Sequence, residues 1–163
     1  MLLEPIVETP YLVTGVFRGF AVHLFHGKVT VDHMAAMEQR SDAWFSTHPG
    51  QMVEMVVIFP SEARMTHAER VRMGQVIKRW EHRRAASATV ILAQGLVGAA
   101  HRSVLTGLLF LAPPPHPTKV FGSTRQAVQW LMPHLGPLCG PEATSVSLSA
   151  AVDHLCVGFS ASR

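Results

Sequence analysis

The strongest pattern of apolar and polar positions lies in residues 52–86. Residues 52–59 (MVEMVVIF) carry one charge, Glu54, and are otherwise apolar, which predicts a strand buried on both faces of a sheet. Thr66 then precedes an apolar stripe at helical spacing, and Glu69 follows three residues later, as in a capping box. A strand, a polar loop and a capped helix in this order predict the first half of a βαβ unit.

The segments on either side continue the alternation of strand and helix patterns. Before residue 52 the sequence predicts strands at 11–17 and 20–25 around an Arg18-Gly19 turn, then a helix that is capped by Thr30 and ends at 48–50. After residue 86 it predicts a strand at 88–93, an apolar helix at 95–111, a strand at 118–121 and a helix that starts at Ser123 and ends at 136–137. This order predicts an α/β fold.

A chain of 163 residues is expected to form one domain with a core of its own. The predicted elements place this α/β domain at residues 11–135, after a lead-in at 1–10 that contains prolines. Residues 136–163 shift in composition to serine, alanine and glycine, which predicts a C-terminal extension with a short helix at 150–157. This extension is expected to dock on the body or on a second subunit, or else to be mobile.

Apolar residues make up 48% of the chain and charged residues only 15%, so a globular protein is expected. The net charge is +3, and most of the excess base lies in the helix after Thr66. There Arg72, Arg79 and Arg83 form a stripe beside the apolar one. Such a stripe suits an acidic partner protein, nucleic acid or an anionic membrane surface, or else it is a solvated helix face.

The residues that carry chemistry do not form a recognised catalytic or metal-binding pattern. Among ten histidines the closest pair is His23 and His26, whose odd separation on a strand places them on opposite faces. The sequence contains no H-E-x-x-H, C-x-x-C or G-x-S-x-G motif, and its few acids do not pair for acid–base work. We therefore expect no enzyme activity, no metal and no cofactor.

The ends and the apolar stretches of the chain suggest where the protein resides. Glu4 and Pro5 interrupt the start, so no secretory leader is expected. The longest uncharged stretches, at 85–100 and 103–118, are too short or too broken by proline to span a bilayer. The cysteines Cys139 and Cys156 form no disulfide framework, and a reducing cytoplasm is the expected compartment.

The segment K-V-F-G-S-T-R-Q-A-V-Q-W-L at 119–131 resembles the close of SpoIIAA-like proteins, the STAS/SEC14-like group common in bacteria. In that group a strand ending in phenylalanine meets a Ser/Thr cap, and an Ala-x-x-Trp-Leu helix follows. The strand at 56–59, the cap Thr66 and the apolar unit at 88–111 also look like that group, so the match covers about 11–135. The resemblance implies a mixed sheet of four or five strands with helices mainly on one face.

STAS-type domains generally act without catalysis, by docking partner proteins or sometimes small ligands, and this is what the resemblance implies here. The phosphorylatable motif of the anti-sigma-antagonist branch, Asp-Ser-(Ser/Thr)-Gly, is absent from the loop at 60–66, which argues against that switch. The leading hypothesis is a regulatory or accessory interaction domain that works as a homodimer. Its predicted partner surface comprises Ser61, Arg64, Arg72, Arg79 and Arg83. Nucleic acid ranks below a protein partner because no recognised binding motif accompanies the arginines.

The apolar helix at 95–111 supports an alternative function of a different class. A helix that is apolar nearly all round must be buried in a core or against a partner. It could also form the wall of a pocket against the sheet, which would bind or carry an apolar small molecule. The residues predicted to line that pocket are His101, Arg102, Leu105 and Leu108.

Overall fold

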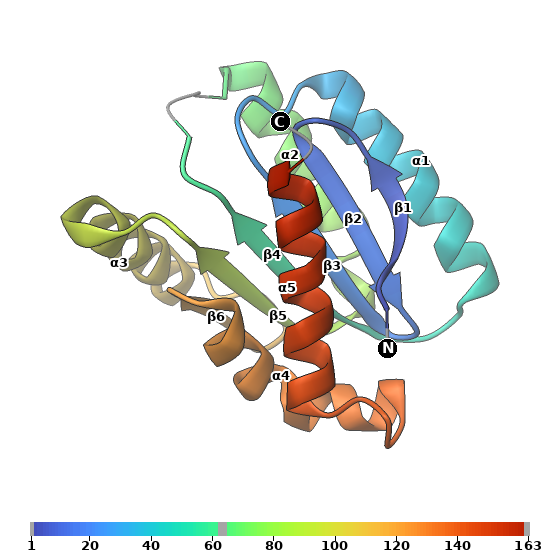
Figure 1. Cartoon of the computed structure of the whole chain (residues 1–163). Helices are drawn as coiled ribbons and strands as arrows, with labels where there is room; N and C mark the ends of the chain where they lie inside the picture. The colour runs from blue at the N-terminus through green and yellow to red at the C-terminus, as the bar shows by residue number, and fades with distance from the viewer. Residues whose placement is uncertain (1, 62–64, 162–163) are drawn as a thin grey trace.

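The computed structural model describes residues 2–61 and 65–161, and its centre is a six-stranded mixed sheet (Figure 1). The strands are β1 Glu4–Glu8, β2 Leu12–Phe17, β3 Phe20–Phe25, β4 Met52–Ile58, β5 Arg84–Ile91 and β6 Thr118–Phe121. They lie across the sheet in chain order, with β1 and β6 at its edges. β1, β2 and β3 pair antiparallel, and each strand from β3 to β6 runs parallel to the next.

Helices cover both faces of this sheet. They are α1 Val31–Thr47, α2 His67–Arg79, α3 Gly95–Leu111, α4 Thr124–Cys139 and α5 Ser145–Ala161, with a 3₁₀ turn, η1, at Glu81–Arg83. On one face α1 and α2 pack over β2, with Leu12, Met34 and Val76 in a common cluster. On the other face α4 and α5 pack over the central strands, with a core that includes Leu131 and Leu148 (Figure 1).

The capped helix starts are confirmed. The Thr66 Oγ1 accepts from the backbone N–H of Glu69, and Glu69 Oε2 accepts from the backbone N–H of Thr66 at 2.6 Å. Thr30 and Ser123 cap α1 and α4 in the same way through their hydroxyl oxygens. These contacts satisfy backbone donors that the first turn of a helix leaves unpaired. The predicted α/β class with a mixed sheet is confirmed as well.

The sheet has one strand more than the four or five that the resemblance implied. The extra strand is β1, which lies inside the segment predicted to be a lead-in. It contains Pro5, and its pairing with β2 is irregular between Pro5 and Val7. Proline cannot donate to a sheet, but it is tolerated on an edge strand, and β1 is an edge strand.

The expectation that helices lie mainly on one face was wrong, and the helix expected at 150–157 is longer than predicted, at Ser145–Ala161. The central strands are apolar on both sides, as Ala21 and Val22 on β3 illustrate, so both faces need cover. The second cover comes from α4, which runs on through Pro133 and Pro137, and from the 17-residue α5. Because Val152 is fully buried in the cluster beneath these helices, α5 is part of the core.

The strand expected at 88–93 lies at Arg84–Ile91, because the preceding helix is shorter than its charge pattern suggested. α2 ends at Arg79, and η1 leads directly into β5. Arg84 is thereby placed opposite Met52 of β4, with its side chain buried in the sheet.

Candidate interaction surface

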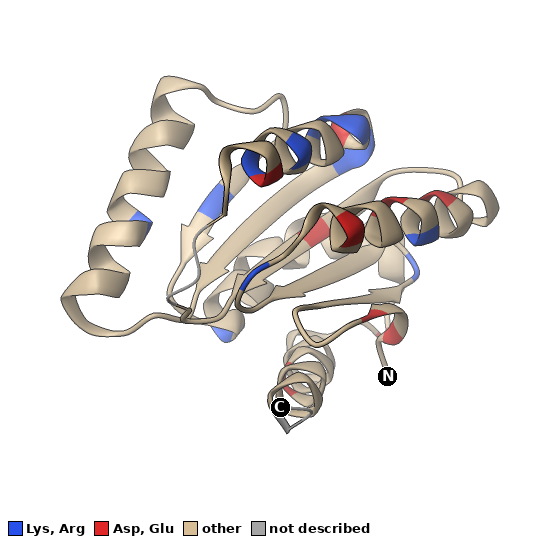
Figure 2. Cartoon of the chain, turned by 90° about the horizontal axis from the view of Figure 1, so that it is seen from above, with Lys and Arg blue, Asp and Glu red and all other residues tan. Residues whose placement is uncertain are grey.

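Two arginines of the predicted basic stripe pair with acidic residues of α1, although Arg79 stays half exposed. Arg72 pairs with Glu38, and Arg79 pairs with Asp42 through two bonds, at 2.6 Å from Nη2 to Oδ2 and 3.2 Å from Nε to Oδ1. The hydrogen bond from Arg79 lowers the pKa of the Asp42 carboxyl, although its partial burial opposes the shift. Figure 2 shows the basic residues of α2 beside the acidic residues of α1. These pairs hold the two helices together.

Arg83, the third arginine of the stripe, is also engaged within the chain. Its guanidinium donates to the carbonyl oxygens of His48 at 2.7 Å and Gly50 at 2.8 Å, and it lies 4.4 Å above the ring centre of Phe45. It thereby ties η1 to the turn after α1. Acids and carbonyl groups distant in sequence therefore pair with all three arginines, and the partner surface predicted for them stays a prediction.

The structure describes only part of the loop between β4 and α2, which was predicted to contribute to the partner surface. Ser61 is exposed just after β4, whereas Arg64 lies outside the described residues. At the far end of the loop, Arg70 donates to the carbonyl oxygen of Met65 at 2.7 Å, which fixes the first turn of α2.

The four residues predicted to line a pocket are not brought together. Arg102 donates to the carbonyl oxygens of Ala93 and Ile91 at 3.1 and 3.3 Å, so it fastens α3 to the end of β5. Leu105 is half-buried, while His101 and Leu108 are exposed. α3 lies beyond the β5–β6 edge instead of over the sheet, as Figures 1 and 2 show. These placements do not favour the predicted pocket between this helix and the sheet.

The side of α3 that faces away from the sheet is an exposed apolar surface. Gly98 is the only fully buried residue of this helix, and an added Cβ there would lie 1.8 Å from the carbonyl oxygen of Ala93. Six large apolar side chains remain exposed by 57–89%: Leu96, Val97, Val104, Leu108, Phe110 and Leu111. Apart from Arg102, α3 contains no lysine, arginine, aspartate or glutamate.

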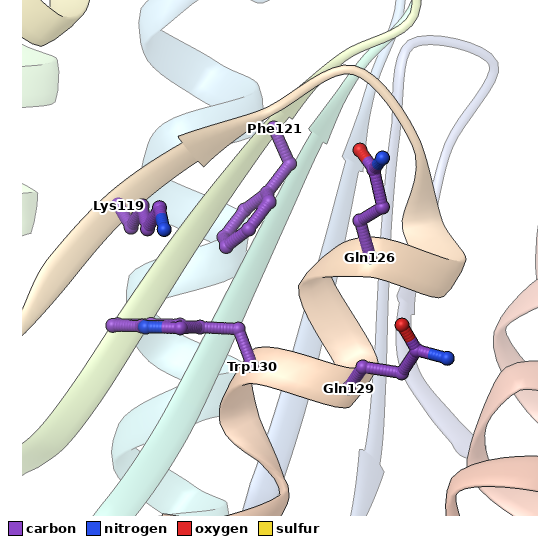
Figure 3. Close-up of a pocket in the computed structure, with 5 residues that line it drawn as sticks. All are labelled: Lys119, Phe121, Gln126, Gln129 and Trp130. Atoms are coloured by element: carbon purple, nitrogen blue, oxygen red, sulfur yellow. The ribbon is translucent and has the colours of Figure 1, made fainter.

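A groove of about 570 Å³ lies between β6 and α4 and is open to solvent. Figure 3 shows Lys119 and Phe121 on β6 and the other three lining residues, Gln126, Gln129 and Trp130, on α4. The rings of Phe121 and Trp130 form its apolar floor, with 5.7 Å between their centres. The groove could hold a flat apolar group with polar atoms at its rim.

A buried polar network, which the sequence analysis missed, crosses the sheet beneath α1. Thr14 Oγ1 lies 2.9 Å from His23 Nδ1, and His23 Nε2 lies 3.3 Å from Glu54 Oε1. Arg84 completes the network, with 2.7 Å between its Nε and Glu54 Oε2 and a bond of 2.6 Å to the carbonyl oxygen of Ile77. The sequence feature that could have indicated this network is Glu54, because a lone carboxylate in a buried strand requires a partner.

The charge of Glu54 is stabilised inside the protein. Burial opposes the carboxylate form, but the hydrogen bond from His23 and the positive charge of Arg84 outweigh it and lower the pKa of Glu54 to about 2. The enclosed cavity beside His23 measures only about 10 Å³, which is room for one water molecule at most. A substrate does not fit there, so we interpret the network as structural.

Other reactive groups do not assemble into a site. The described residues contain no group of three or more histidine, cysteine, aspartate or glutamate side chains placed to hold one metal ion. Cys139 and Cys156 are free thiols, and burial raises the pKa of Cys156 to about 12, which keeps it protonated at neutral pH. None of the helices in the described part of the chain has the length and apolarity needed to cross a membrane.

Comparison with known proteins identifies the fold. No family model and no curated protein matches the sequence. Among solved structures, the chain is similar to an uncharacterized DUF3478-family protein from Shewanella loihica, which is described as having a SpoIIAA-like fold. The two superpose with a TM-score of 0.57 and 15% identity, over 74% of this chain and 94% of the other. The expected resemblance is confirmed at the level of structure: this chain has a SpoIIAA-like fold.

Proposed function

We propose that this protein is a non-catalytic interaction domain of the cytoplasm that binds a protein partner through the outward face of α3. The observation that carries the proposal is the set of six exposed apolar side chains on a helix fastened to the domain at its inner side. Contiguous apolar surface of this kind marks interaction sites on proteins that otherwise bury such groups. The free thiols suit a reducing compartment.

The energetics of burying this face are adequate for specific binding. Full burial of a large apolar side chain contributes about 1.5–3 kcal/mol, so six of them contribute roughly 9–18 kcal/mol. Association itself costs about 4–15 kcal/mol. The surplus is modest, and it supports a reversible partner rather than a permanent one.

A catalytic role has less support. The histidine and carboxylate nearest to each other, His23 and Glu54, are both buried and are paired with Thr14 and Arg84. The half-buried thiol of Cys156 is protonated at neutral pH. Neither the groove between β6 and α4 nor the small cavity beside His23 therefore presents a side chain that is activated as a nucleophile or as a general base.

The proposal is tested by affinity purification with Val104→Glu, which places a charge in the middle of the apolar face. Thr106→Glu is the control, because Thr106 is exposed on the same helix but lies nearly opposite Val104 around the helix axis. Bait protein carrying each substitution is expressed in the source cell together with an untagged copy. We expect wild type and the control to retain a protein that Val104→Glu loses. Retention of the same proteins by all three baits would refute the proposal.

The groove beside β6 supports a second candidate function, the binding of a small molecule with an aromatic or other flat apolar group. Its floor of Phe121 and Trp130 and its rim of Lys119, Gln126 and Gln129 are the supporting observation. Native mass spectrometry of freshly purified protein tests it. A retained small molecule that is lost from Trp130→Ala is the expected result, and equal retention by both proteins would exclude this groove.

A further inference from the structure

The outward face of α3 carries a heptad pattern. Val97, Ala100, Val104, Gly107 and Leu111 follow one another at spacings of 3, 4, 3 and 4 residues, and all five are exposed. Such spacing places residues along one line of a helix and is the pattern of helices that pair with one another. We call these five residues the α3 seam. The half-buried residues of the helix, Arg102 and Leu105 among them, lie on its opposite side.

Large and small residues alternate strictly along the α3 seam. The large ones are Val97, Val104 and Leu111, and the small ones are Ala100 and Gly107. An added Cβ at Gly107 would meet no atom within 4 Å, so nothing inside the chain requires glycine there. Glycine in a helix interior is destabilising relative to alanine. Because the space around Gly107 is open, we infer that its reason lies in a second molecule.

The seam is complementary to itself when one copy is reversed. The antiparallel register that brings the most layers into coincidence sets Val97 against Gly107 and Ala100 against Val104. Each of its four layers joins a large residue to a small one. Facing large and small side chains fill the space between helices without voids. A parallel pair would set Gly107 against Gly107 and leave a gap.

We propose that the partner of α3 is a second copy of this chain, whose own α3 packs antiparallel along the seam in a two-fold dimer. This inference rests on the proposed function, since it names the occupant of the same face. A two-fold axis brings the same surface of both copies together, which requires a self-complementary patch.

The charges on α3 favour a second copy over an anionic membrane. Helices that lie on anionic membranes carry lysine and arginine beside their apolar face. Here the only such residue is Arg102, whose guanidinium is bound to the carbonyl oxygens of Ile91 and Ala93. An uncharged apolar face is matched by another of the same kind.

The size of the surface sets the expected strength. A helix of 17 residues is about 25 Å long, and it presents fewer residues than the roughly 20–30 on each side of a standard interface. We therefore expect a reversible dimer with a dissociation constant in the micromolar range, which dilution separates.

Sedimentation equilibrium of the full chain, from about 1 µM to about 300 µM, tests the inference. Val104→Glu should weaken the dimer at least about tenfold, while Thr106→Glu should leave its dissociation constant unchanged. Gly107→Leu is the decisive variant. It enlarges the apolar surface, yet it fills the small position and should weaken an antiparallel dimer by a similar factor. Circular dichroism of each variant verifies that the exposed substitutions leave the fold intact.

Two results would overturn the inference. The first is a wild-type chain that stays monomeric at the highest concentration. The second is a Gly107→Leu dimer as tight as wild type or tighter, which would mean parallel or unspecific contact. For a monomeric chain, co-sedimentation with vesicles of phosphatidylcholine and phosphatidylglycerol, lost in Val104→Glu, would assign the face to lipid. If Val104→Glu instead removed only a different captured protein, the proposed function would stand without the second copy.

Discussion

Replacing Glu54 by glutamine tests the buried network most directly, because it removes one charge and keeps the shape of the side chain. The side chains of Glu54 and Arg84 are exposed by only 10% and 3%. Glutamine therefore leaves the Arg84 guanidinium buried without its counter-charge. Removal of one partner from a buried ion pair destabilises proteins by about 3–5 kcal/mol, and we expect a loss of that size at pH 7.

The pH dependence of this loss follows from the pKa of Glu54. The pKa falls from its ordinary value of 4.5 to about 2 on folding, which corresponds to about 3 kcal/mol. The folded state binds the proton more weakly than the unfolded state. The stabilisation is therefore complete above pH 4.5 and is lost as the pH falls toward 2. About 2 kcal/mol of it should disappear between about pH 5 and about pH 3.

The assay is urea denaturation of wild type and Glu54→Gln at intervals of pH, with the free energy of unfolding extrapolated to water. The pKa of Asp42 is also lowered, so other carboxylates contribute to the pH dependence, and the difference between the two proteins removes their contribution. The difference should shrink by about 2 kcal/mol from about pH 5 to about pH 3. A constant difference over that range would show that Glu54 is not charged and paired in the folded protein.

Two further substitutions test individual contacts, each by thermal or urea denaturation. Arg79→Ala should lower the free energy of unfolding only slightly, because the pair with Asp42 is half exposed, and the loss should diminish in about 1 M salt. A large loss that is insensitive to salt would contradict this assignment. Gly98→Ala should destabilise the protein by about 1–3 kcal/mol, since its Cβ would overlap the carbonyl oxygen of Ala93. Gly74→Ala, which meets open space on α2, should be neutral or stabilising, and equal effects at both glycines would count against the close approach.

The helix starts could be predicted because their causes are local in the sequence. Thr66 and Glu69 satisfy each other's backbone donors within a single turn. The spacing of the two residues in the sequence is therefore enough to predict the contact. The strand β4 was predictable for a similar reason, since an apolar run that ends at a proline allows few alternatives. The order of strand, loop and capped helix was then sufficient to predict the α/β class.

The contacts of the arginines could not be predicted from the same local patterns. Periodicity placed Arg79 on a polar stripe of α2, but it could not place Asp42 of α1 opposite it, because that depends on how the two helices pack. Arg84 was assigned to the end of a helix, although it lies 30 residues from Glu54 and is buried against it. The lone charge of Glu54 predicted that a partner exists, while the fold alone determines which residue it is.

The apolar pattern of α3 has two separate causes, one on each side of the helix. The glycine at 98 and the arginine at 102 fasten the inner side of the helix to the end of β5, through a close approach and two carbonyl contacts. Neither requirement extends to Val104, which is 64% exposed, or to Gly107, where an added Cβ would meet no atom within 4 Å. A helix apolar all round was expected to be buried, and the domain buries only its inner side. The apolar residues of the outer side are therefore not explained by contacts within a single chain. Packing against a second, antiparallel copy explains them, because the alternation of large and small residues is complementary to its own reverse.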